Sequence, residues 1–162
     1  MKTMIRLYKK LFFLAWAFVV TTAHSQGDKS SSIKSMIETK RFVFKVQSVL
    51  PTSMPMRQLT GDDYYVHLFG DSLVSYLPYF GRSYTAPLPG APGGYNFTSK
   101  DFEYTGKNKK KGGWDVVIKP KDVKDLREFN LTVSENGYAS LRALSNNRQL
   151  ITYNGYLAEA RN

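Results

Sequence analysis

Apolar and polar residues alternate along most of the chain after residue 40. Phe42, Phe44 and Val46 alternate with their neighbours over residues 41–49, and the same period of two returns in later segments. These segments are residues 64–69, 73–78, 95–104, 114–119, 129–133, 138–144 and 149–157. A period of two places successive side chains on opposite faces of an extended chain. The pattern therefore predicts about seven or eight short strands.

The connections between these segments are short and rich in turn-forming residues. Three dipeptides stand between predicted strands: Gly70-Asp71, Asn136-Gly137 and Asn146-Asn147. Because asparagine and glycine both tolerate a positive φ, the second of them predicts a hairpin closed by a type I′ turn. Parallel strands need long crossovers, so short connections predict antiparallel neighbours.

Two segments have a helical rather than an extended pattern. Ile33, Met36 and Ile37 share one face of a helix over residues 32–40, and residues 122–127 fit one helical turn. A meander of short strands removes its exposed edges by curling. We therefore predict an α+β, mainly β, fold, in which a curled antiparallel, barrel-like meander has one N-terminal helix packed on it.

The first 25 residues have the three-part layout of a secretory signal peptide. Basic residues precede the apolar run 11–20, and small and polar residues follow it over 21–26. Cleavage after Ser25 or after Ala23 would leave a single domain over residues 26–162; an uncleaved membrane anchor is the alternative. The apolar run is short for a transmembrane span. We therefore expect an exported protein, periplasmic or extracellular in a Gram-negative bacterium, with no stable membrane anchor after cleavage.

Composition narrows the class of protein further. The formal charge of +10 falls to +6 without residues 1–25, because 19 basic and 13 acidic residues remain. The chain has no cysteine, which excludes disulfide-stapled folds, thiolate catalysis and cysteine-ligated metal sites. Packing alone must therefore hold the fold together.

Aromatic residues gather in residues 71–97, around a run of proline and glycine at 86–94. The candidate ligand-binding residues are Tyr76, Tyr79, Phe80, Arg82, Tyr84 and Tyr95. Their rings suit stacking on a sugar or on an apolar small molecule, and a guanidinium between rings can orient an anionic group. Glycans and other components of the cell envelope are therefore the expected partners. The alternative is that these residues are simply core residues of a small β protein.

A second candidate surface is basic. Lys107, Lys109, Lys110 and Lys111 precede Trp114, a pattern that suits a polyanion with Trp114 stacking on a ring. The alternative is a soluble hairpin tip, and export argues against intracellular nucleic acid as the partner.

Catalytic chemistry has little support in the sequence. His67 is the single histidine after residue 25, and no serine lies in a GxSxG elbow. Asp62, Asp63 and Asp71 flank one predicted strand, and paired carboxylates of this kind could serve a small hydrolase. We expect no cofactor and no catalytic residue, with the hydrolase as the alternative.

Five runs together resemble a known bacterial family. They are SYLPYFGRSY (75–84), GGYNF (93–97), KKKGGW (109–114), ENGYASL (135–141) and ITYNGYL (151–157). The resemblance is to the small secreted proteins known as domain of unknown function four-two-five-one, and it covers nearly all of the chain after residue 25. It implies an exported protein and no known activity, site residue or ligand. With the aromatic surface, it indicates a binding or structural module of the cell envelope.

Overall fold

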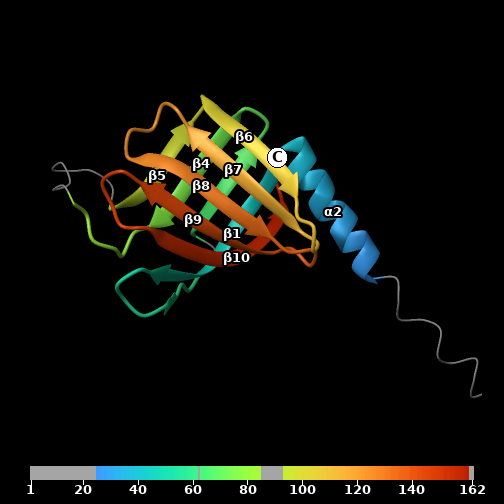
Figure 1. Ribbon diagram of the computed structural model, residues 1–162, viewed down its shortest axis with the longest axis horizontal. Coiled ribbons are helices and arrows are strands. Elements are labelled where there is room, and N and C mark those ends of the chain that lie inside the picture. The colour runs from blue at the N-terminus through green and yellow to red at the C-terminus, as the bar shows by residue number, and fades with distance from the viewer. Residues whose placement is uncertain (1–24, 62, 85–92, 161–162) are drawn as a thin grey trace, which may run out of the picture.

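The computed structural model describes residues 25–61, 63–84 and 93–160. The predicted signal peptide, apart from Ser25, and most of the proline- and glycine-rich loop lie outside these residues. One helix, α2 (Ser25–Thr39), precedes the strands (Figure 1). The strands are β1 (Arg41–Pro51), β2 (Arg57–Gln58), β3 (Tyr65–Phe69), β4 (Ser72–Pro78), β5 (Gly94–Ser99), β6 (Phe102–Asn108), β7 (Trp114–Pro120), β8 (Leu126–Val133), β9 (Tyr138–Ser145) and β10 (Ile151–Glu159).

All the strands belong to one antiparallel sheet that curls into a nearly closed barrel. Its order is β5-β4-β3-β1-β10-β9-β8-β7-β6, and the short β2 pairs with β1. β1 is long enough to pair with β3 through its first half and with β10 along its whole length. A bulge between Val46 and Ser48 bends β1 where its other side passes from pairing with β3 to pairing with β2. The predicted fold class is confirmed.

The core fills the barrel with the inward-facing residues of every long strand. Phe42, Phe44 and Tyr153 are among its largest buried side chains. β5 and β6 stand at the two ends of the strand order and do not pair with each other. Aromatic contacts connect β5 with the opposite side of the barrel instead: Tyr95 meets Phe129 of β8 edge-on, and Phe97 stacks on the same ring.

Helix α2 covers one end of the barrel (Figure 1). It begins at Ser25, seven residues before the predicted start, and its predicted apolar residues Ile33, Met36 and Ile37 are buried. Glycines allow the helix to approach the strands closely. A Cβ on Gly106 of β6 would lie 3.3 Å from Ile37 Cγ2, and one on Gly137 would lie 3.1 Å from Ile33 Cδ1. Among the described helices, none has the length and apolarity needed to cross a membrane.

Three local predictions were wrong. Residues 95–104 form two strands, β5 and β6, and this break, together with the two-residue β2, raises the strand number above the prediction. Residues 122–127 form no helical turn. The β8–β9 hairpin has no type I′ turn, because Gly137 has a positive φ and Asn136 does not. It is a longer loop, in which Gly137 N–H donates to Ser134 O (2.9 Å) and the Asn136 side chain accepts from Tyr138 N–H.

Candidate functional site

The segment 79–84 lies at the end of the barrel away from α2 and is fixed to the turn between β9 and β10. β4 ends at Pro78, as the missing backbone donor predicts. Beyond it, Tyr84 N–H donates to Asn147 O (2.8 Å), and Gln149 N–H donates to Arg82 O (3.0 Å). Two backbone hydrogen bonds therefore hold a segment that has no regular secondary structure of its own.

A cluster of two buried and three partly buried side chains supports this segment from below. We call it the Arg148 cluster. It comprises the buried Tyr95 and Tyr153 and the partly buried Tyr79, Asp125 and Arg148. Arg148 Nε lies 2.7 Å from Asp125 Oδ2, and the Arg148 side chain is only 13% exposed. Its guanidinium lies over two rings, 5.1 Å from the centre of Tyr79 and 5.2 Å from that of Tyr95. Tyr153 donates its hydroxyl to Pro78 O (2.7 Å). The cluster thus ties the ends of β4, β9 and β10 together.

Burial shifts the acid–base behaviour of the cluster. Desolvation raises the pKa of the Tyr79, Tyr95 and Tyr153 hydroxyls above their usual value, and the nearby Arg148 charge opposes this only in part. The Tyr79 hydroxyl also lies 2.9 Å from Arg82 O and 3.0 Å from Gln149 O, where it can donate to either. All three tyrosines are neutral near pH 7.

The raised pKa values predict a protein that loses stability in alkali. An unfolded tyrosine releases its proton near pH 10, whereas the buried ones keep theirs. The contribution of the buried tyrosines is therefore complete below about pH 10 and is lost as the pH rises toward their native pKa. Tyr95 and Tyr153, the two buried tyrosines, each contribute a slope of up to about 1.4 kcal/mol per pH unit to the free energy of unfolding, whereas the more exposed Tyr79 contributes less because solvent screens it. Urea unfolding between about pH 9 and 12 measures it.

The variant Tyr153→Phe tests this assignment. Loss of the hydrogen bond to Pro78 should lower stability at neutral pH by about 1 kcal/mol. The alkaline slope should nevertheless become shallower, because one buried hydroxyl has been removed. An unchanged slope in Tyr153→Phe would show that Tyr153 does not contribute to the alkaline transition.

Exposed side chains project from this supported segment. Tyr84 is 68% exposed, and Arg82 is exposed with no ion-pair or side-chain hydrogen-bond partner among the described residues. Phe80 is half-buried and carries the guanidinium of Arg57 5.0 Å from its ring centre. We call these four residues, Arg57, Phe80, Arg82 and Tyr84, the loop-end surface. It presents two cations and two aromatic rings on a fixed backbone.

The six predicted ligand-binding residues therefore fall into three places. Phe80, Arg82 and Tyr84 lie together at the loop end. Tyr79 and Tyr95 lie beneath them, and Tyr95 is only 2% exposed, so it supports the surface without reaching it. Tyr76 is exposed on the outer face of β4, where its ring stacks on Tyr64 with 6.0 Å between ring centres.

Sequence reasoning missed Arg57 and Arg148. Each comes from a segment distant along the chain, and neither stands in a motif that marks it. A possible signal for Arg148 was Asn146-Asn147, which predicted a turn at this point but no contact with residues 79–84. The pairing of β2 with β1 positions Arg57, and an isolated antiparallel bridge between Ser83 and Arg148 joins the β9–β10 turn to residues 79–84.

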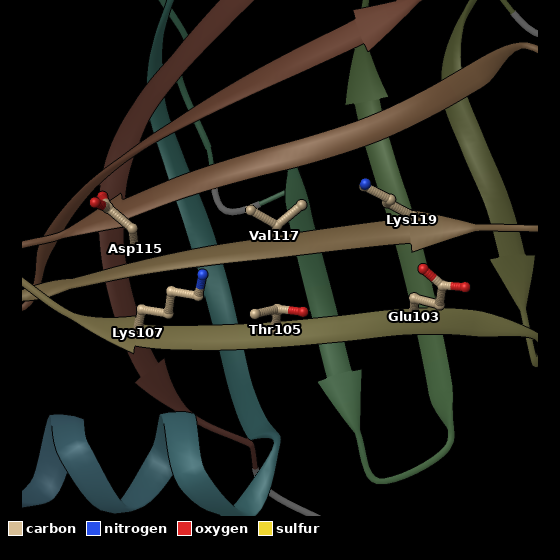
Figure 2. Close-up of a pocket in the computed structure, with 6 residues that line it drawn as sticks. All are labelled: Glu103, Thr105, Lys107, Asp115, Val117 and Lys119. Carbon is tan, nitrogen blue, oxygen red and sulfur yellow. The ribbon is translucent and has the colours of Figure 1, made fainter.

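The lysine segment is exposed, but Trp114 is not part of its surface. Lys109 Nζ lies 4.0 Å from Asp115 Oδ1, whereas Lys107, Lys110 and Lys111 have no ion-pair partner within the described part of the chain. Trp114 is 7% exposed and points into the barrel, so it cannot stack on a surface ligand. A hollow of about 270 Å³ on the outer face of β6 and β7 is lined by Lys107 and Lys119 but also by Glu103 and Asp115. Figure 2 shows these side chains on the two strands.

Asp63 and Asp71, the two candidate carboxylates that the structure describes, are too far apart to act as a catalytic pair. Asp63 precedes β3 and Asp71 follows it, so the length of the strand separates them by roughly 20 Å. Glycoside hydrolysis needs two carboxyl groups within about 10 Å. Asp62 lies outside the described residues. His67 packs against Phe69, and within the described ranges no group of three His, Cys, Asp or Glu side chains is placed to hold a metal ion.

Comparison with known proteins agrees with this description. The model of a family described as a domain of unknown function (DUF4251) matches residues 24–157. The chain is also similar to a DUF4251 family protein from Bacteroides eggerthii DSM 20697, known from its crystal structure, with a TM-score of 0.61 and 14% sequence identity. The similarity covers 83% of this chain and 92% of that one, and at this identity it shows a shared fold. No curated protein matches the chain.

Proposed function

Because this chain belongs to the DUF4251 family, which carries no assigned activity, we propose from its own side chains that it is a ligand-binding module of the bacterial cell envelope. Residues 1–25 direct its export in this proposal, and residues 26–162 form the one domain that remains. The loop-end surface makes the contact with the ligand. The basic n-region and apolar run at the N-terminus support the export step.

The observation that supports this proposal is that exposed side chains of the loop-end surface stand on a backbone that is fixed by hydrogen bonds. Arg82 and Tyr84 are free to contact a ligand, while the backbone between them is hydrogen-bonded to residues 147 and 149. The Arg148 cluster lies beneath them and is partly buried. A surface that is already ordered loses little conformational entropy on binding. Packing of the core does not explain the exposed Arg82 and Tyr84, because core aromatic residues pack without them.

The chemistry of the surface defines the class of ligand. Tyr84 offers a ring face that suits the apolar face of a sugar, and Phe80 supports the Arg57 guanidinium that lies over its ring. Arg82 and Arg57 offer guanidinium groups that bind carboxylate or phosphate with two hydrogen bonds. An anionic glycan of the cell envelope combines both features, and it is the ligand that we propose.

The test is binding of uronic acid oligosaccharides, measured by calorimetry. Tyr84→Ala and Arg82→Ala should each weaken binding by about tenfold or more, equivalent to about 1.4 kcal/mol. Tyr138→Ala is the matched control, because Tyr138 is 60% exposed but belongs to the β8–β9 hairpin at the opposite end of the barrel. Equal affinities for all three variants, or no glycan bound by the native protein, would refute this function.

A second candidate function is polyanion binding by the lysine segment. It is favoured by Lys107, Lys110 and Lys111, which have no ion-pair partner in the described part of the chain. Binding to these lysines would weaken steeply with salt, because it releases counterions, whereas ring stacking at the loop end would change little. The salt dependence of any binding therefore separates the two functions.

A further inference from the structure

Helix α2 packs against side chains of β6, where Tyr104 donates its hydroxyl to Ile37 O (2.8 Å). β6 ends the sheet, and no described strand lies on its second side. It pairs with β7 alone, and two backbone hydrogen bonds fix the register: Lys109 N–H to Gly113 O (2.9 Å) and Lys121 N–H to Asp101 O (2.8 Å). Along one strand of an antiparallel pair, residues whose N–H and C=O groups bond to the neighbouring strand alternate with residues whose groups point the other way. The odd-numbered residues of β6 therefore bond to β7, and the even-numbered ones direct N–H and C=O away from it. These are Phe102, Tyr104, Gly106 and Asn108, and no backbone partner meets them among the described residues.

The outer face of the same strand has a symmetric charge pattern. Its odd-numbered positions are Glu103, Thr105 and Lys107, and Asp101 and Lys109 continue the series just beyond its two ends; all five are exposed. Two acids precede the threonine and two lysines follow it at the same spacing. Figure 2 shows Glu103, Thr105 and Lys107 side by side along β6, on the face turned toward the reader. A strand with this pattern is complementary to an antiparallel copy of itself.

We propose that β6 is a dimer interface, in which the open edge pairs antiparallel with β6 of a second copy about a two-fold axis at Thr105. Glu103 then lies opposite the partner subunit's Lys107, and Asp101 lies opposite the partner subunit's Lys109. Tyr104 exchanges both backbone hydrogen bonds with the partner subunit's Gly106, and Phe102 does so with the partner subunit's Asn108. Two barrels thereby share one continuous sheet. The interface is independent of the loop-end surface.

In the proposed dimer, the charged residues of the two β6 strands lie directly opposite one another at the closest pairs of the ladder. The open N–H and C=O groups are on even residues, so the odd residues form the non-hydrogen-bonded pairs of the new ladder, whose Cα atoms are closest and whose side chains meet. Lys107 has no ion-pair partner in the described part of the chain. Glu103 and Lys109 have intrachain partners, Lys121 at 3.1 Å and Asp115 at 4.0 Å, but these pairs are exposed and weak. They do not prevent Glu103 and Lys109 from meeting a second subunit.

The competing role of such lysines is to keep an edge strand unpaired. That role needs charge of one sign along the edge, which repels any copy of itself. The edge of β6 has both signs, arranged symmetrically about Thr105. A single strand from each subunit buries a small area, so we expect a dimer that forms reversibly with concentration.

Sedimentation of the purified protein, expressed from its full sequence, tests the charge pattern. At low salt, where exposed charges are least screened, the native protein should dimerise between about 10 µM and about 1 mM. Glu103→Lys and Lys107→Glu each set like charges opposite one another twice and should weaken dimerisation at least tenfold. The double variant Glu103→Lys/Lys107→Glu restores the complementarity and should dimerise again. A monomeric native protein, or single variants that dimerise like it, would overturn the proposal.

A cysteine probe tests the register, because the native chain contains no cysteine. Across the two-fold axis, Cα atoms at position 105 would lie about 4.5 Å apart, within the range of a disulfide. Thr105→Cys should therefore form a disulfide-linked dimer in mild oxidant. Val117→Cys is the control: Val117 pairs with Thr105 on β7, and two such residues would lie about 14 Å apart. Equal rates of cross-linking for the two variants would exclude this register.

Discussion

Replacement of Gly155 by alanine should destabilise the protein by at least about 3 kcal/mol, or prevent it from folding. Gly155 lies in β10 opposite Val46, at the bulge where β1 bends. A Cβ there would overlap the carbonyl oxygen of Lys45 and lie 3.1 Å from Val46 Cα. Both are backbone atoms, so no side-chain rotation relieves the overlap. The central strand pair of the barrel would have to separate.

Urea unfolding of the variants measures this effect. Gly93→Ala is the matched control, because a Cβ on Gly93 would meet no atom of the described residues within 4 Å. The stability of Gly93→Ala should stay within about 0.5 kcal/mol of the native protein. If Gly155→Ala were as stable as Gly93→Ala, β1 and β10 would have room to move apart at the bulge, and the close approach would not be a constraint on the fold.

The repeating part of the fold was predictable because it depends on local periodicity. The alternation in residues 41–49 and 129–133 specified strands, and short connections specified antiparallel pairing. The break between β5 and β6 was not predictable in this way. Asp122 holds that corner, where its carboxylate accepts hydrogen bonds from Ser99 Oγ and Lys100 N–H (3.1 Å). The corner therefore depends on a residue more than 20 positions away, in addition to the polar run of residues 99–101.

The candidate site was likewise predictable where it depends on local sequence and unpredictable where it depends on distant residues. Composition identified the segment 79–84, and the period of two placed Tyr76 on the opposite side of β4 from the buried Leu77. Which ring is buried beneath the segment depends on Arg148 and Asp125, which other strands bring there. The charge pattern around Thr105 is also visible in the sequence. It indicates a dimer interface only when the register with β7 shows which N–H and C=O groups of β6 have no partner strand.

Replacement of Phe129 by alanine should cost about 3–5 kcal/mol, because it removes a large, fully buried side chain. Phe129 is fully buried on β8, and its ring meets Tyr95 and Phe97 of β5 at centre distances of 6.2 and 6.1 Å. No backbone hydrogen bond joins β5 to the far side of the barrel among the described residues. This aromatic contact therefore supplies cohesion that the sheet lacks there.

Phe129→Leu separates the ring contacts from the loss of volume. Leucine fills most of the space, so this variant should cost only about 1–2 kcal/mol in urea unfolding. Hydrogen exchange provides the local measurement. In Phe129→Leu the amides of β5 should exchange faster relative to those of β10, because β5 loses its aromatic partners while β10 keeps strands paired on both sides. Uniform acceleration in both strands would mean that hydrogen bonding to β4, and not the contact with Phe129, holds β5 in the barrel.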